Sequence, residues 1–282
     1  MDLRVEAPRV RSVSAPWKLA LLGDPVAHSK SPVMQNAALA ALGLEGGYEL
    51  IRCPAGELAE HLPRLAEEGF TGLNLTVPLK EEGFRLLEDL SLEAQRLEAV
   101  NTLRLKAEKW QGHNSDLEGF TTAAREHFGD MKGKRVLVLG AGGAARAVLA
   151  ALVDADVRSI ELWNRSQERA RGLLETFVAA GVELALSDDV EVSWTRSDLV
   201  VQATSLGLHK EDALPPLPAT ECVAAVMDLI THDTPWLAAC RERGLSCADG
   251  RDMLLGQGAA AFSYWTDMTA PREAMRRALY TL

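Results

Sequence analysis

Cysteine is scarce in this sequence and shows no pattern. The 282 residues include four cysteines, and no two of them are separated by two residues: Cys53, Cys222, Cys240 and Cys247. A C-x-x-C redox centre or a cysteine-based metal site is therefore not indicated, and we expect no metal. Reduced thiols in the cytoplasm are the simplest interpretation.

Positive charge and long apolar runs are also in short supply. Lys and Arg number 30 against 40 Asp and Glu, and the net charge of −10 argues against a general nucleic-acid-binding protein. No apolar run approaches the ~20 residues of a membrane span. Residues 1–16 are polar and lack the apolar core of a secretory signal. We expect a soluble cytoplasmic protein in which residues 1–16 form a flexible extension.

Aromatic residues make up only 5% of the chain, whereas Ala and Leu are abundant, which favours a helix-rich α/β architecture over an all-β sandwich. In the first part of the chain, apolar runs alternate with helical patterns. The predicted strands are 17–22, 48–53, 72–77 and 100–105, and the predicted helices are 31–42, 57–68, 81–87 and 92–97. This rhythm predicts a mostly parallel sheet. A further helix should run from Asp116, as its N-cap, to about His127.

A second α/β pattern begins near residue 133. The predicted strands are 135–139, 159–163, 199–203 and 223–229, and the tail from Asp252 onward is helical in pattern. We therefore predict two domains. The N-terminal, mostly parallel α/β domain spans 17–116 and is completed by C-terminal helices, 251–282, that pack back on it. A Rossmann-like domain spans 117–250.

A glycine-rich turn follows the strand 135–139. Gly140, Ala141, Gly142, Gly143 and Ala144 fit the pattern G-x-G-x-x-G/A together with the small residue after them. Because a strand precedes the pattern and a helix follows it, the turn can bring backbone N–H groups close to a pyrophosphate. The alternative is a tight turn without a ligand.

The end of the strand 159–163 bears on the choice of cofactor. An NAD site usually has an acidic residue here, whereas this chain has Asn164, Arg165 and Ser166, with Arg169 one helical turn further on. A cation and short donors suit a 2′-phosphate and favour NADP. A pair of ordinary surface arginines is the alternative. The loop 202–207, with Thr204, should lie beside the cofactor.

Four polar stretches follow strands in the first domain. They are 28–32, 74–80, 101–102 and 114–116. Each has an ordinary explanation by itself: Ser31 before Pro32 as a cap, Lys80 as a solvated charge, Asn101 as a turn former. Together, beside a dinucleotide fold, they suit carbonyl reduction, in which a hydride reaches carbon and a proton reaches oxygen. A lysine ammonium can supply that proton when desolvation disfavours its charged form.

The order of these motifs resembles that of the shikimate dehydrogenase family over roughly residues 17–270. The resemblance is carried by the segments 23–32, 74–80, 99–102 and 114–116, the glycine turn, 164–166, 248–250 and 253–257. It implies reversible, NADP-dependent reduction of 3-dehydroshikimate to shikimate. It also implies Lys80 as the acid/base catalyst paired with Asp116, Ser29 and Ser31 on the substrate carboxylate, and ring hydroxyls bound by Thr76, Asn101 and Gln257. The glycine turn through Arg146 and the segment 164–169 would bind NADP, with Gly250 and Met253 flanking the nicotinamide.

The chain departs from the family pattern at several positions. Thr231 stands where a Tyr is usual, in a loop about two residues shorter, which bears on substrate affinity or identity. Gln202 replaces an Asn, and His113 replaces an Asp. Asp252 replaces a Gly and would place a carboxylate near the nicotinamide end, where it could disturb closure around the cofactor.

Two other hypotheses stay open at this point. One is a relative in the same family with another substrate, such as quinate, or with NAD as cofactor. The other is a catalytically silent nucleotide-binding relative. The expected partner is a small molecule, with neither nucleic acid nor membrane, and the sequence leaves monomer and homodimer equally open.

Overall fold

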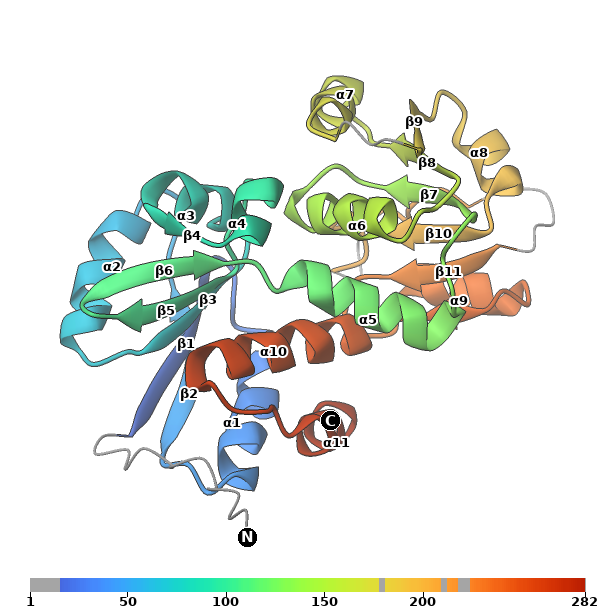
Figure 1. Cartoon of the computed structure of the whole chain (residues 1–282). Helices are drawn as coiled ribbons and strands as arrows, with labels where there is room; N and C mark the ends of the chain where they lie inside the picture. Colours follow the sequence, from blue (N-terminus) through green and yellow to red (C-terminus); the bar gives the residue numbers. More distant parts are fainter. Residues whose placement is uncertain (1–15, 178–180, 209–211, 218–223, 282) are drawn as a thin grey trace, which may run out of the picture.

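The computed structural model describes residues 16–177, 181–208, 212–217 and 224–281. It has two lobes, each built on a six-stranded sheet, with helices on the sheets and between them (Figure 1). The predicted two-domain α/β fold is confirmed. The predicted flexible extension lies outside the described residues except for Pro16, and the positions of the domain boundaries stay a prediction.

The sheet of the first lobe has the order β2-β1-β3-β5-β6-β4 and is mixed. Its strands are β1 (Trp17–Gly23), β2 (Gly46–Arg52), β3 (Gly72–Leu75), β4 (Asp89–Leu90), β5 (Thr102–Lys106) and β6 (Lys109–His113). β1 is parallel to β2 and β3, as predicted, but β5 is antiparallel to both β3 and β6. The β5–β6 hairpin was not predicted because its turn residues, Ala107 and Glu108, have positive φ without being Gly or Asn.

The helices of the first lobe are α1 (Ser31–Ala41), α2 (Leu58–Glu67), α3 (Lys80–Leu86) and α4 (Leu92–Leu97). α2 buries Leu58, Leu62 and Leu65 along one face, the spacing of an amphipathic helix. At the outer edge of the sheet, the Asn36 side chain of α1 bonds both main-chain groups of Tyr48. Its Oδ1 accepts from the Tyr48 N–H at 2.8 Å and its Nδ2 donates to the Tyr48 carbonyl at 3.1 Å.

The sheet of the second lobe is parallel throughout, in the order β12-β11-β10-β7-β8-β9. Its strands are β7 (Arg135–Leu139), β8 (Ser159–Trp163), β9 (Glu183–Leu186), β10 (Leu199–Gln202), β11 (Ala225–Asp228) and β12 (Cys247–Ala248). Its helices are α6 (Gly143–Asp154), α7 (Gln167–Glu175), α8 (Val190–Arg196) and α9 (Pro235–Glu242). The chain order reverses between β7 and β10, which is where open α/β sheets bind ligands.

Two long helices cross between the lobes side by side (Figure 1): α5 (Asp116–Phe128) and α10 (Arg251–Thr266). They touch through glycine, because a Cβ at Gly119 would lie 2.8 Å from the Met253 carbonyl oxygen and a Cβ at Gly256 would lie 2.9 Å from Gly119 Cα. α10 and α11 (Arg272–Tyr280) then pack on α1 and β1 through an apolar cluster that includes Leu255, Phe262, Met275 and Leu279. The predicted return of the C-terminal helices to the first lobe is confirmed. Among the described residues no helix has the length and apolarity to cross a bilayer.

Candidate active site

A cavity of about 230 Å³ opens between the lobes. All the residues predicted to act in catalysis or to bind substrate line it: Ser29, Ser31, Thr76, Lys80, Asn101, Asp116 and Gln257. Ala144, Gly250 and Met253, predicted to lie near the cofactor, line it too. The carboxyl ends of β1 and β3 and the starts of α5, α6 and α10 therefore meet at one place, although the role of each residue stays a prediction.

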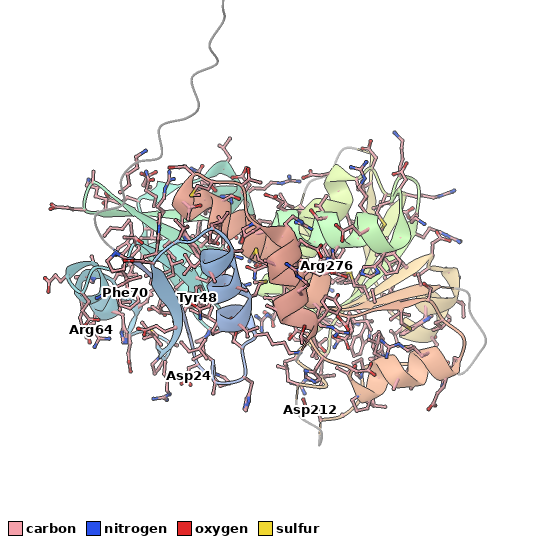
Figure 2. All side chains as sticks on the ribbon, turned by 90° about the horizontal axis from the view of Figure 1, so that it is seen from below. Asp24, Tyr48, Arg64, Phe70, Asp212 and Arg276 are labelled. Carbon is pink, nitrogen blue, oxygen red and sulfur yellow. The ribbon has the colours of Figure 1, made fainter. Side chains whose placement is uncertain are left out.

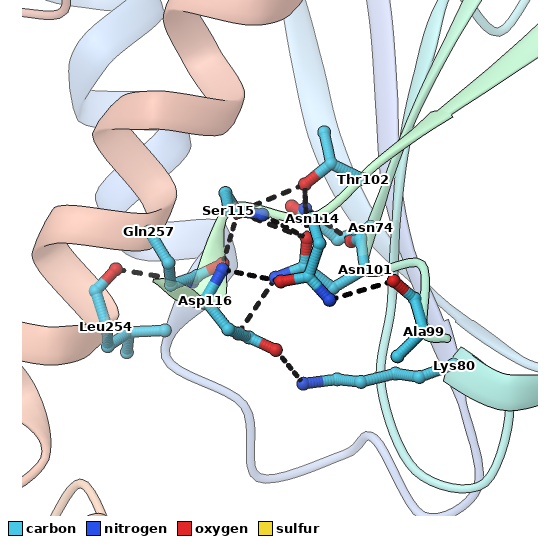
Figure 3. A network of polar contacts seen from close by, with 10 residues as sticks. All are labelled: Asn74, Lys80, Ala99, Asn101, Thr102, Asn114, Ser115, Asp116, Leu254 and Gln257. Atoms are coloured by element: carbon cyan, nitrogen blue, oxygen red, sulfur yellow. Dashed lines mark hydrogen bonds and ion pairs between the residues drawn. The ribbon is translucent and has the colours of Figure 1, made fainter. Parts of the chain in front are cut away.

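The Lys80 ammonium and the Asp116 carboxylate form the most direct polar contact of the cavity (Figure 3). Lys80 Nζ donates to Asp116 Oδ2 at 2.5 Å, and the two side chains are 17% and 7% exposed. Lys80 is the first residue of α3, where a cation gains nothing from the helix dipole. Its position there is accounted for by Asp116 and the cavity, and not by the stability of α3.

Asp116 was expected to cap its helix, and this was wrong. Ser115 occupies the N-cap position and Asp116 is the first helical residue, with its own N–H donating to Asn114 Oδ1 at 2.9 Å. The carboxylate is thereby left free to accept from Lys80 through Oδ2 and from Asn101 Nδ2 through Oδ1, the latter at 2.8 Å.

Asn101 connects this pair to a buried polar network (Figure 3). Its Oδ1 accepts from the Ser115 N–H at 2.8 Å and from Thr102 Oγ1 at 2.8 Å, and its carbonyl accepts from Asn74 Nδ2 at 2.9 Å. Gln257 of α10 reaches the same group, with 3.5 Å between its Oε1 and Ser115 Oγ. Because these partners bond one another, the Asp116 carboxylate is held in one position before any ligand arrives.

The cavity is also lined by two serines at the start of α1. The Ser31 N–H donates to Ser29 Oγ at 3.2 Å, and Ser31 is buried. The ordinary explanation of Ser31 as a cap is wrong, because Lys30 holds the N-cap position and no side-chain cap bond forms. Both serines line the cavity, where hydroxyl groups suit a carboxylate.

Sequence reasoning missed Asn74 and Tyr48. Asn74 lines the cavity, and the buried Tyr48 hydroxyl donates to Asn74 Oδ1 at 2.9 Å. Burial raises the pKa of Tyr48 far above its usual value, with a Ser31 hydrogen bond opposing the shift, so the phenol stays a neutral donor. Asn74 could have been found from the sequence, because it places an amide between Leu73 and Leu75, two buried residues of a strand. A buried polar group needs a hydrogen-bond partner.

The glycine turn after β7 has the backbone of an anion site. Gly140 has φ +108°, and a Cβ there would lie 2.9 Å from Thr204 Cγ2, so the turns after β7 and β10 meet at the point where the strand order reverses. Gly142 holds the N-cap position of α6 without a side-chain cap, and a Cβ on it would meet only open space. The first N–H groups of α6 have no partner within their helix and suit the diphosphate of a dinucleotide.

The residues expected at the 2′-phosphate lie on the neighbouring strand-to-helix turn. Asn164 Nδ2 donates to the Ser166 carbonyl at 2.9 Å, and Ser166 caps α7 by accepting from the Arg169 N–H. Arg165 and Arg169 are exposed, and their guanidinium groups form no ion pair or hydrogen bond with the described part of the chain. Two uncommitted cations beside the glycine turn fit a phosphorylated ribose.

Asp228, at the end of β11, is a further residue that sequence reasoning did not single out. It is fully buried and accepts from Thr234 Oγ1 at 2.7 Å, from the Ile230 N–H at 3.0 Å and from Gln202 Nε2 at 3.3 Å. Burial raises its pKa to about 6, although the hydrogen bonds from Thr234 and Ile230 oppose the shift. The loop that it anchors includes Leu229 and Thr231, both of which line the cavity.

The departures from the family pattern fall in different places. Thr231 lines the cavity. His113 lies outside the cavity lining, stacked on Tyr264 with ring centroids 4.9 Å apart. Asp252 also does not line the cavity. Its Oδ2 forms a hydrogen bond with His127 Nε2 at 2.8 Å and its Oδ1 an ion pair with Arg276 Nη1 at 3.0 Å, near the junction of the lobes where Figure 2 labels Arg276. The disturbance of cofactor closure expected from Asp252 stays a prediction.

Three family models match the chain in sequence order. They are the shikimate dehydrogenase substrate binding domain over residues 21–103, shikimate / quinate 5-dehydrogenase over 122–210 and the shikimate 5'-dehydrogenase C-terminal domain over 250–280. The NADP(+) shikimate dehydrogenase of one strain of Thermus thermophilus is 42% identical and covers 93% of this chain and 98% of its own.

Solved structures agree with the family models. Shikimate 5-dehydrogenase from another strain of Thermus thermophilus, in complex with NADP(H) and shikimate, has a TM-score of 0.83 at 38% identity and covers 94% of this chain and 99% of its own. Quinate dehydrogenase from Corynebacterium glutamicum, in complex with NAD, has a TM-score of 0.82 at 29% identity, covering 95% and 99%.

The fold and the cavity together define a two-domain α/β protein with a dinucleotide-type glycine turn facing a polar pocket. Within that class, the chain belongs to the shikimate dehydrogenase family.

Proposed function

We propose that the protein catalyses the reversible, NADPH-dependent reduction of 3-dehydroshikimate to shikimate. The observation that carries this proposal is the Lys80–Asp116 pair, held at 2.5 Å in a cavity that the glycine-turn helix also reaches through Ala144. The similarity to shikimate dehydrogenases over nearly the whole chain supports the same assignment.

In this proposal NADPH, when bound, supplies the hydride, and the side chains of the cavity do the rest. Lys80 Nζ donates a proton to the carbonyl oxygen as it becomes a hydroxyl, and takes one back in the reverse direction. Asp116 orients the ammonium, and Asn101 fixes Asp116 from the other side. Ser29 and Ser31 hold the substrate carboxylate.

The remaining contacts set the orientation of the substrate ring and the choice of cofactor. Thr76, Asn101 and Gln257 are assigned to the ring hydroxyls, since all three line the cavity. The glycine turn is assigned to the diphosphate, and Arg165 with Arg169 to the 2′-phosphate, because their guanidinium groups are exposed and uncommitted. Thr204, Gly250 and Met253 would complete the nicotinamide side.

A second candidate is activity on quinate or with NAD. The observation that favours it is Thr231, which lines the cavity with a short side chain, together with the similarity to an NAD-bound quinate dehydrogenase. A spectrophotometric assay of shikimate and quinate, each with NADP and with NAD, decides between the two. Higher kcat/KM for shikimate with NADP is expected, and preference for quinate with NAD would overturn the first assignment. Absence of turnover with every combination of substrate and cofactor would favour the third hypothesis, a catalytically silent nucleotide-binding relative.

We also propose the division into a catalytic domain, 17–116 with 251–282, and a cofactor domain, 117–250, in a protein of the cytoplasm. The free thiols Cys53 and Cys247 and the net charge of −10 support this setting and a small-molecule partner without nucleic acid. Cys222 lies outside the described residues. Size-exclusion chromatography with light scattering distinguishes monomer from homodimer.

A further inference from the structure

Two ion pairs join α4 of the first lobe to α6 of the second, which face each other across the boundary (Figure 1). Arg96 binds Asp154 through two hydrogen bonds, Nη1 to Oδ2 at 2.8 Å and Nη2 to Oδ1 at 2.7 Å. Arg146 Nη1 binds Glu98 Oε2 at 3.0 Å. Both contacts lie outside the cavity lining, and of the four residues only Arg146 has an expected role above, at the end of the glycine turn that would bind NADP.

Three of these four charges sit where their own helix does not favour them. Glu98 ends α4 in the left-handed region, with φ 48° and ψ 36°, a position that suits glycine. Arg146 lies in the first turn of α6 and Asp154 is its last residue, so each stands at the end of the helix dipole that repels its charge. Local rules broken without a local benefit indicate a function outside the helix. For all three residues, the partner that accounts for the charge belongs to the opposite lobe.

The polarity of the pairs fixes how α6 lies against α4. Arg146 and Asp154 are about 12 Å apart along α6, and they meet opposite charges near the end of α4. If α6 were reversed, Arg146 would face Arg96 and Asp154 would face Glu98. The two pairs thus hold both ends of α6 in one orientation.

The position of α6 matters because this helix carries the glycine turn to the cavity. A Cβ at Gly143 would lie 3.7 Å from Lys80 Cδ, and Ala144 lines the cavity itself. The pairs are half-exposed, with side chains 41% and 48% exposed for Arg96 and Asp154, and 19% and 50% for Arg146 and Glu98. Half-exposed pairs are individually weak and are screened by salt, so such a contact can open and close.

We infer that Arg96, Glu98, Arg146 and Asp154 form an interdomain latch whose members are positioning residues: they hold the glycine turn of α6 against Lys80 and so set the closed arrangement of the cleft. The effect of the latch on turnover rests on the proposed function, whereas its effect on lobe closure does not. Opening the latch removes binding energy common to substrate and transition state, so KM should rise with little change in kcat.

The test compares Arg96→Gln with Arg135→Gln. Arg135 makes a similar two-bond pair with Asp198, at 3.0 and 3.2 Å and with side chains 49% and 39% exposed, but both residues belong to the second lobe. Arg96→Gln should weaken NADP+ binding in calorimetry about three- to tenfold and enlarge the radius of gyration in X-ray scattering. Arg135→Gln should change neither. Equal changes of NADP+ affinity and of radius of gyration in the two variants overturn the latch.

A charge exchange separates the latch from a general loss of structure. Asp154→Arg alone places two cations together and should weaken NADP+ binding most, while Arg96→Asp with Asp154→Arg should restore it to within about twofold of the original protein. Failure of the exchange to restore binding and compactness overturns the proposal. If the unmodified protein shows no turnover, the proposed function fails, and calorimetry and scattering still decide the latch.

Glu98→Gly gives a second, independent test of the latch. Glycine relieves the left-handed backbone, so the melting temperature should stay the same or rise, while NADP+ binding weakens about twofold to fivefold. Glu98→Gln, which keeps the backbone strain and loses the charge, should weaken binding equally. A residue with a purely structural role would lose stability and binding together, and that result contradicts the latch. If Arg146 acted only by binding the cofactor diphosphate directly, neither Glu98 variant would lose affinity for NADP+. Unchanged affinity in both variants would therefore also contradict the latch.

Discussion

The two sides of the cleft are prepared for their ligands in different ways. On the side of the first lobe, Lys80, Asp116, Asn101 and Ser115 are bonded to one another and are largely buried. On the side of the second lobe, exposed arginines and uncapped helix N–H groups are committed to nothing else in the described chain. The difference teaches that the fold itself positions the groups proposed for catalysis, whereas it leaves the groups proposed for the cofactor without partners among the described residues. Substitutions should therefore act differently on the two sides.

The largest effect is expected at Lys80. Lys80→Ala removes the proposed proton donor and should lower kcat by about a thousandfold, within the usual range for acid–base groups. NADP+ affinity in calorimetry should be unchanged. Lys109→Ala, at an exposed residue of β6, is the control and should keep full activity. Residual kcat within tenfold of the original in Lys80→Ala would remove Lys80 from the mechanism.

The second largest effect is expected on the free energy of unfolding, when the buried network of the first lobe loses Asn101. Asn101→Ala leaves the Ser115 N–H and Asp116 Oδ1 without a buried partner and should lower the free energy of unfolding by about 3 kcal/mol. Urea denaturation measures it. Gln111→Ala removes an amide from an exposed hydrogen bond to Asp89 and should cost less than about 0.5 kcal/mol. Equal losses of free energy of unfolding in the two variants would show that the buried network stabilises the fold no more than an exposed hydrogen bond does.

Asp228 sharpens the comparison, since its hydrogen-bond donors are neutral while Asp116 is bonded to an ammonium. Its folded pKa of about 6 exceeds the unfolded 3.8, so the native state binds the proton more tightly. Its contribution to stability is therefore greatest below about pH 4 and decreases as the pH rises to about 6, by up to about 3 kcal/mol.

Asp228→Asn should flatten the pH dependence of stability in this window, as measured by thermal unfolding between pH 4 and pH 7. His232 and Asp249 also influence Asp228, in opposite directions, and both remain in the variant. An unchanged pH profile would show that Asp228 does not titrate there.

The smallest effect is expected on the cofactor side. Arg165→Ala should raise the KM for NADP about tenfold and leave the KM for NAD unchanged, because only NADP carries the 2′-phosphate. Its free energy of unfolding should change by less than about 0.5 kcal/mol, since the side chain is exposed. Equal KM changes for both cofactors would show that Arg165 does not contact the phosphate.

The sequence predicted regular elements well where periodicity is strong. The helix Leu92–Leu97 and the strands Arg135–Leu139 and Ser159–Trp163 have the predicted bounds. β9 and β12 were missed because each is short and lies at an edge of the sheet, where burial leaves a weak pattern. The hairpin turn at Ala107 and Glu108 has no glycine or asparagine to signal it.

The site could be assembled from the sequence because parallel strands end at a common edge, where their polar successors converge. The capping assignments of Ser31 and Asp116 failed because a residue one position inside a helix has the same local sequence as a cap. Asn74 and Asp228 were missed as site residues because their roles depend on partners that are distant in sequence, such as Asn101 for Asn74 and Gln202 for Asp228.

Asn36, described above at the outer edge of β2, also bears on how molecules of this protein meet. Its amide occupies the main-chain N–H and carbonyl of Tyr48, the groups that an incoming strand would need there. A second copy could not extend the sheet at this position without first displacing that side chain, so strand-by-strand aggregation is obstructed at this edge.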